Sequence, residues 1–390
     1  MTVADELARL VAGTREARAR SAQRIDAMLE AVDFGELQGV LLSQRLLPLV
    51  GSRIVAIGGD RVPGDFARAV EAAAAAERRR GLFSSHVTRS LVAALESAGV
   101  PAVPFKGTVT AERVHGDLGL RPSSDIDLLA ERSQLRTALG VLLDLGYELP
   151  HGRSSDAIPP LHYGLVDGGG QRPDVDLHWR VHWYEEDYGA AMIERSLTDP
   201  DLGRVLAPLD DLTMLLLCYA RDGFVGLRYP ADIAAWWDRF GDELAPGELD
   251  RLVARHPGLE RALVAAVRVT DSVVDVPLTP LLAAARRPDW RTRTAIRLAN
   301  WAERGASDQV VANERLVDWL LSPRGGSAAF ARRFVLPGRS SVVRYDHLPA
   351  ESRPPEAIWR LTHPAKLLSR CLSAMWRVRG QRAWARVDPS

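Results

Sequence analysis

Residues 104–130, PFKGTVTAERVHGDLGLRPSSDIDLLA, decide the fold, because they combine a Lys-Gly turn with two aspartates in an apolar run. Asp125 and Asp127 flank Ile126 and precede two leucines, which predicts a strand. Residues at i and i+2 of a strand project from one face, so both carboxylates point the same way. Two anions held this close repel each other, and a divalent cation that binds both removes the cost. The sequence therefore predicts a metal-binding strand.

The segment ahead of this pair has the parts of a phosphate-binding corner. Residues 100–105 are short and mostly apolar, which favours a strand, and Lys106-Gly107 predicts a turn into a helix over residues 108–115. Free backbone N–H groups and the helix dipole both favour an anion at such a corner. A tight structural connection has the same composition, so the corner alone does not establish a binding site. Lys106 is nevertheless one of only two lysines in the chain.

A second acidic strand is predicted over residues 173–183, where polar and apolar residues alternate. Asp174, Asp176, His178, Arg180 and His182 fall on one face, and Val175, Leu177, Trp179, Val181 and Trp183 on the other. Residues 161–166 predict its hairpin partner, joined through Asp167 and three glycines. A solvated edge strand would alternate in the same way, but two Asp and two His favour a functional face.

These strands suggest one site. If they lie side by side, Asp125, Asp127 and Asp176 converge opposite the Lys106-Gly107 turn. Magnesium binds few protein carboxylates and keeps positions open for phosphate oxygens and water. Two such ions can activate an attacking hydroxyl and neutralise a leaving pyrophosphate. The three carboxylates are therefore candidate ligands of a magnesium nucleotide site.

Composition limits the classes of function. The 390 residues are 46% hydrophobic and 26% charged with a formal net charge of zero, which is typical of a soluble globular protein and argues against long nucleic acid as a partner. Residues 322–390 carry thirteen basic and four acidic residues, which predicts a basic tail. Cys218 and Cys371 form no CxxC motif or disulfide framework. With no signal-peptide pattern and no long apolar run, we expect a cytoplasmic protein without a membrane span.

Helical periodicity predicts the remaining organisation. We expect two or three helices over residues 3–50, an Ala-rich helix over 65–81 that ends at Gly81, and a further helix over 84–97. The predicted domains are a helical region (1–82), a catalytic core (83–188), a helical domain (189–321) and the basic tail with a docking helix near 365–378 (322–390).

The motifs FKG, SDIDLL and VDLHW, with Arg121 in the intervening loop, resemble bacterial uncharacterised nucleotidyltransferases of the superfamily that shares the DNA polymerase β catalytic fold. The resemblance covers residues 91–240 and includes Leu227-Arg228-Tyr229 ahead of Asp232. It implies an α+β fold, in which a small mixed β-sheet nucleotidyltransferase core is flanked by helical N-terminal and C-terminal regions.

The resemblance also implies roles for individual residues. Asp125 and Asp127 would be metal ligands, and Asp176 would be the third catalytic carboxylate and metal ligand. Gly107 would let the nucleotide phosphates approach the backbone, with Lys106, Arg121 and Ser124 as phosphate contacts. His178 would orient a carboxylate, accept the acceptor's proton or make a structural hydrogen bond. The turn is Lys-Gly-Thr where the superfamily usually has Gly-Ser or Gly-Gly, and the gap from Gly107 to Asp125 is longer than common, which leaves the triphosphate contacts open.

The resulting hypothesis is an enzyme that transfers NMP from an NTP to a hydroxyl or similar acceptor, with Mg²⁺ or Mn²⁺ as cofactor and release of pyrophosphate. A small molecule or a peptide is the favoured acceptor, and a protein side chain or an RNA end is compatible. The alternative is a non-catalytic nucleotide-binding or partner-binding protein, such as a toxin-antitoxin component. A zinc hydrolase using His178 and His182 lacks a third ligand at matching spacing, and no GxSxG motif supports a serine hydrolase.

Overall fold

The computed structural model describes residues 2–150, 158–159, 161–282, 286–302, 308–323, 325–326 and 328, and single positions between 362 and 372. For residues 308–313 only the backbone is described. The predicted basic tail and its docking helix near 365–378 therefore lie largely outside the described residues. None of the helices within the described ranges has the length and apolar character needed to cross a lipid bilayer.

A five-stranded mixed sheet lies at the centre of the fold. Its strands are β1 (Ala102–Phe105), β2 (Asp125–Ala130), β3 (Tyr147–Glu148), β4 (His162–Asp167) and β5 (Asp174–His178). They are arranged in the order β1-β2-β5-β4-β3, in which β2 and β5 are parallel and the other neighbours are antiparallel. A separate two-stranded ribbon consists of β6 (Leu197–Asp199) and β7 (Gly203–Val205). The expected α+β fold with a small mixed sheet is confirmed.

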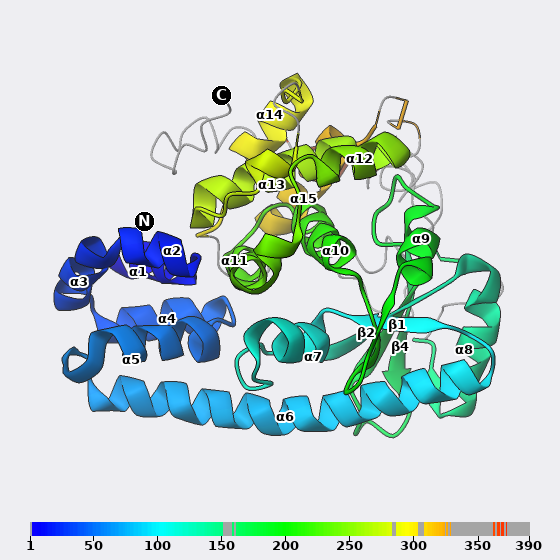
Figure 1. Ribbon diagram of the computed structural model, residues 1–390, viewed down its shortest axis with the longest axis horizontal. Coiled ribbons are helices and arrows are strands. Elements are labelled where there is room, and N and C mark those ends of the chain that lie inside the picture. Colours follow the sequence, from blue (N-terminus) through cyan, green and yellow to red (C-terminus); the bar gives the residue numbers. More distant parts are fainter. Residues whose placement is uncertain are drawn as a thin grey trace.

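Along the chain, helices come before, between and after the strands of the sheet (Figure 1). Before it come α1 (Val3–Ala12), α2 (Arg15–Arg20), α3 (Ala22–Ala31), α4 (Phe34–Ser43), α5 (Ser52–Gly58) and α6 (Gly64–Ser97), and within it α7 (Gly107–Thr110) and α8 (Leu135–Asp144). After it come α9 (Tyr188–Glu194), α10 (Pro208–Arg221), α11 (Arg228–Phe240), α12 (Glu248–Arg255), α13 (Glu260–Val274), α14 (Trp290–Arg297) and α15 (Asp308–Leu321). Single 3₁₀ or π turns are at Leu47–Gly51, Gly59–Arg61, Ala111–His115, Arg132–Gln134, Gly241–Glu243, Pro257–Leu259 and Thr279–Leu281.

The two faces of the sheet belong to different hydrophobic cores. Ile126, Leu128 and the β5 residues Val175 and Leu177 pack with the second half of α6 and with α8. On the opposite face, Val103, Phe105 and Leu129 join a larger core that unites the N-terminal helices with α10, α11 and α13. Because side chains alternate along a strand, the carboxylates of β2 share this second face. The acidic residues therefore lie between the sheet and the helical region.

Helix α6 replaces two helices that we expected to be separated at Gly81. It is continuous over 34 residues and runs under both the N-terminal helices and the sheet (Figure 1). Gly81 is buried in its interior, and a Cβ atom there would lie 2.9 Å from the Leu118 Cβ and 3.1 Å from the Leu118 carbonyl oxygen. The glycine thus permits close approach of the loop after residues 111–115 and does not end the helix.

The alternation predicted through Trp183 also ends early, because β5 stops at His178. Trp179 packs into the core between the sheet and α8, whereas Val181 packs into the larger helical core. Their side chains therefore do not share one sheet face as predicted. Arg180 and His182 likewise lie beyond the strand.

Replacing Gly81 by Ala should destabilise the protein by about 1–3 kcal/mol, because the added methyl group overlaps Leu118. Gly140 in α8 is a matched control, since a Cβ atom there meets nothing within 4 Å. Gly140→Ala should stabilise by about 0.5–1 kcal/mol through helix propensity alone. Urea unfolding of both variants tests this, and equal stabilisation by both would show that Gly81 is not a packing requirement.

Glu314 in α15 predicts a pH-dependent contribution to stability. Burial, together with the Asp222 charge, raises its pKa from 4.5 to about 7. The folded state thus binds the proton more tightly, so this contribution is full below pH 4.5 and is lost as the pH rises through 7. Between pH 5 and pH 8, the free energy of unfolding of the wild type should fall by about 2 kcal/mol more than that of Glu314→Gln. Denaturant unfolding of both proteins at the two pH values measures this difference. Parallel pH profiles of the two proteins would contradict the assignment.

Candidate active site

The parallel pairing of β2 with β5 places the predicted carboxylates in register on one face of the sheet. Asp127 is in register with Asp176, and Asp125 with Asp174. Asp127 is buried, Asp125 is half-buried, and the Asp176 side chain is 31% exposed. Burial, followed by the charges of Asp127 and Asp125, raises the pKa of Asp176 to about 6. The sheet therefore creates a local excess of negative charge that a cation can relieve.

Lys106 supplies a positive charge to this group. It follows β1 directly, and its Nζ lies 2.9 Å from Asp127 Oδ1, with both side chains buried. Burial opposes ionisation of both side chains, but the attraction between their charges is stronger. The pKa of Lys106 is therefore raised, and the pKa of Asp127 falls well below its usual range. The Lys106 backbone has φ 54° and ψ −148°, a region that favours glycine. Such conformations cost about 1–3 kcal/mol and concentrate at functional sites.

His178 contacts the same oxygen of Asp127. Its Nε2 lies 3.1 Å from Asp127 Oδ1, and its Nδ1 lies 3.4 Å from the carbonyl oxygen of Arg180. Phe105 packs edge-on against the imidazole with ring centroids 5.1 Å apart. Burial lowers the pKa of His178, although Asp127 opposes the shift. His178 therefore helps to fix the orientation of the Asp127 carboxylate.

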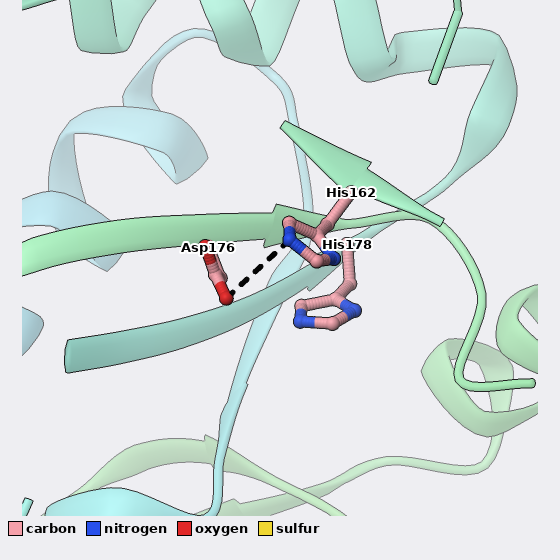
Figure 2. A group of neighbouring side chains, drawn as sticks. All are labelled: His162, Asp176 and His178. Atoms are coloured by element: carbon pink, nitrogen blue, oxygen red, sulfur yellow. Dashed lines mark ion pairs between the residues drawn. The ribbon is translucent and has the colours of Figure 1, made fainter. Parts of the chain in front are cut away.

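His162 joins the site from the neighbouring strand, which the sequence reasoning did not anticipate. In the antiparallel pair of β4 with β5, His162 is opposite His178 and Gly164 is opposite Asp176. The His162 Nε2 lies 3.5 Å from Asp176 Oδ2, and the two imidazole centroids are 4.6 Å apart (Figure 2). The sequence did contain a signal for His162. Counting residue pairs outward from the glycine turn of the hairpin places His162 opposite His178.

Arg121 lies beside the Lys-Gly turn and is held there by a carboxylate of α11. Its Nε donates to Asp232 Oδ2 at 2.9 Å and its Nη1 to the Gly107 carbonyl oxygen at 3.3 Å. His115 Nε2 lies 2.9 Å from the other oxygen of Asp232. Burial would raise the pKa of Asp232, but Arg121 and His115 lower it to about 2. Asp232 is therefore ionised, and the network ties the turn to the helical region.

Gly107 and the two serines differ in their surroundings. Gly107 has φ +43°, and a Cβ atom on it would lie 3.2 Å from the hydroxyl oxygen of Ser123. Ser123 donates to the Asp125 carbonyl oxygen at 3.2 Å, whereas Ser124 is exposed. The glycine is required by both its backbone conformation and the close approach of residue 123. The phosphate-contact roles of Lys106, Arg121 and Ser124 remain predictions.

Arg221 at the end of α10 is a further cationic residue that the sequence did not single out. Burial raises the pKa of Asp176 and lowers that of His162; the Arg221 charge partly opposes the first shift and adds to the second, so the guanidinium acts on the acidic group from the helical side. The apolar helix around it gave no hint of this position, because the contact depends on how α10 packs on the sheet.

The donor chemistry fits a divalent cation. Asp125, Asp127 and Asp176 provide hard carboxylate oxygens on neighbouring strands. Asp176 becomes harder to ionise in the presence of the other two carboxylates, as expected for ligands that a cation would stabilise. Asp127 is balanced by Lys106 in this structure.

Removing Lys106 should expose the cost of the buried Asp127 carboxylate. Lys106→Met is expected to destabilise the protein by about 3–5 kcal/mol, because a buried charge loses its partner. In the double variant with Asp127→Asn, much of that loss should be recovered. A double-mutant cycle by chemical unfolding measures the coupling, and additive effects would contradict a direct interaction.

Comparison with known proteins agrees with this arrangement. The family model described as uncharacterised nucleotidyltransferase matches residues 30–275 of the 390, a range that contains β1 to β5 and α10 to α11. No curated protein matches the chain significantly. The family match covers more than half of the chain and includes every acidic residue of the site. The chain therefore belongs to the uncharacterised nucleotidyltransferase family.

Proposed function

We propose that the protein is a metal-dependent nucleotidyltransferase that moves NMP from an NTP to a hydroxyl or similar acceptor and releases pyrophosphate. The observation that carries the proposal is the register of Asp127 with Asp176 on parallel strands, with Asp125 two residues earlier. A family match to nucleotidyltransferases supports the reaction class. The cofactor is Mg²⁺ or Mn²⁺, and the NTP is a co-substrate.

Each side chain of the site has a role in this proposal. Asp125, Asp127 and Asp176 would hold the divalent cations, which would supply activation of the attacking hydroxyl and charge neutralisation of the leaving pyrophosphate. Lys106 keeps the buried Asp127 carboxylate ionised, and its ammonium can donate to phosphate when that carboxylate has another counter-charge. His178 orients Asp127 through its 3.1 Å contact.

The Lys-Gly turn is the proposed phosphate-binding element. Gly107 allows the turn to adopt φ +43° and to pack against Ser123, and Arg121 fixes the turn through the Gly107 carbonyl oxygen. Asp232 holds Arg121 from α11, so the helical region sets the position of the turn. Exact placement matters because phosphoryl transfer depends mainly on alignment and charge stabilisation.

The zero net charge favours a small molecule or a peptide as acceptor over long nucleic acid. We place the reaction in the cytoplasm, because the sequence holds only two cysteines, which lie far apart and give no disulfide pattern. The alternative, a non-catalytic nucleotide-binding or partner-binding protein, is less well supported because all three carboxylates are present on one sheet face.

Asp127→Asn and Asp176→Asn should each lower transfer activity by at least about 10³-fold, since each removes a charged ligand at the reacting phosphate. Asp174→Asn is the matched control: it lies on the same strand face as Asp176 but is exposed, and it should retain most activity. The assay follows each α-labelled NTP into small-molecule, peptide and RNA fractions with Mg²⁺ present.

Full activity in Asp127→Asn would refute the proposed site. Wild-type protein that binds NTP with Mg²⁺ but transfers no label to any fraction would instead support the non-catalytic alternative. Thermal unfolding of each variant separates loss of activity from loss of folding.

A further inference from the structure

We propose that His162, Asp176 and His178 form a binding site for a divalent transition-metal ion such as Mn²⁺, Co²⁺ or Zn²⁺. This deepens the proposed function and rests on it for the catalytic use of the ion, but metal binding can be measured without NTP. Among the described residues, these three are the one group of three or more His, Cys, Asp or Glu side chains whose ligand atoms all lie within 4.8 Å of one another.

The backbone fixes the three side chains on one side of the hairpin. Asp176 and His178 are two residues apart on β5, and His162 lies directly across from His178 on β4. Figure 2 shows the His162 ring directed toward Asp176 with the His178 ring beside it. Small side-chain rotations bring such atoms to metal-bonding distance, because the backbones are already paired.

Both nitrogens of His178 face oxygen atoms. Nε2 lies 3.1 Å from Asp127 Oδ1 and Nδ1 lies 3.4 Å from the Arg180 carbonyl oxygen. A neutral imidazole has one N–H, so at one of these contacts a nitrogen lone pair faces an oxygen. Without a metal ion, Nε2–H donates to Asp127 Oδ1; with an ion bound, the ring proton would be on Nδ1 and be donated to the Arg180 carbonyl, which frees the Nε2 lone pair for the ion. This is the usual arrangement of a metal-binding histidine, whose second nitrogen is fixed by a carbonyl.

His162 provides an independent observation. Its Nδ1 is buried and has no hydrogen-bond partner in the part of the chain that the structure describes, while its Nε2 lies 3.5 Å from Asp176 Oδ2. A buried nitrogen without a partner costs about 1–3 kcal/mol. With one nitrogen near Asp176 and the other unsatisfied, the imidazole can turn to bind an ion without breaking an existing strong hydrogen bond.

Gly164 leaves room at the carboxylate. It is paired with Asp176, and a Cβ atom at this position would lie 3.3 Å from Asp176 Oδ1. Any side chain at this position would crowd Asp176 Oδ1, the carboxylate oxygen that does not contact His162. Gly164 therefore leaves the Asp176 carboxylate uncrowded.

The donor set selects the class of ion. Two imidazole nitrogens and one carboxylate oxygen suit Mn²⁺, Co²⁺ or Zn²⁺, whereas Mg²⁺ prefers oxygen ligands alone. Three protein ligands also leave coordination positions for water or a phosphate oxygen. A site of this kind would prefer a transition metal over Mg²⁺ at the Asp176 end of the carboxylate group, while Asp125 and Asp127 provide oxygen ligands only.

The test is pulsed EPR and calorimetry of the full chain with Mn²⁺ alone. Wild type should bind Mn²⁺ and show ¹⁴N coupling from imidazole, and Mg²⁺ should compete only weakly. His162→Ala should lose the coupling of one imidazole and weaken Mn²⁺ binding by at least about tenfold. His86→Ala, an exposed histidine on α6, is the matched control and should bind as wild type does. Gly164→Ala should also weaken binding by crowding Asp176.

Mn²⁺ bound without nitrogen coupling, or with unchanged affinity in His162→Ala, would overturn the inference. The proposed function is tested separately by Mg²⁺-dependent label transfer. If His162→Ala keeps that transfer and wild type shows no nitrogen coupling, the metal inference fails and the proposed function stands. Circular dichroism of His162→Ala and of the milder His162→Gln confirms folding, so that a lost signal reports the ligand.

Discussion

The buried carboxylate of Asp127 is the constraint on which the structure of the site depends. It is 5% exposed, and its Oδ1 is contacted by both Lys106 and His178. A charge buried to this extent is tolerated only with close partners. One partner comes from the turn after β1 and the other from the end of β5, so Asp127 links the three strands that make the site. The negative charge of Asp176 next to it is left with weaker compensation, and this is where a cation gains most.

The helical region contributes to the site through charge as well as packing. Asp232 of α11 holds Arg121 and His115, and Arg121 in turn holds the Gly107 carbonyl oxygen. Arg221 of α10 adds positive charge on the same side of the sheet. Because the acidic face of the sheet is the one that packs toward these helices, the sheet and the helical region form one structure around the carboxylates.

Local sequence patterns predicted four of the five strands of the sheet and the acids on them, but missed β3, the β6-β7 ribbon and the partners of the acids. The two-residue spacing of Asp125 and Asp127 and the alternation at Asp174 to His178 predicted two strands with acids on one face, but the parallel register between them comes from the structure. Contacts between distant segments were not predictable in the same way. The capture of Arg121 by Asp232 depends on helix packing, and the position of His162 depends on the hairpin register. Gly81 was predicted to end a helix. In the structure a glycine is needed at this position because Leu118 packs closely against it.

The central claim is that the acids of β2 and β5 bind the cation that carries an NTP. Anomalous diffraction from crystals grown with Mn²⁺ and a non-hydrolysable NTP analogue tests it most directly. We expect an anomalous peak in contact with Asp127 and Asp176, with phosphate oxygens at the Gly107 turn. Analogue bound elsewhere, or bound without a peak while Lys106 still contacts Asp127, would contradict it.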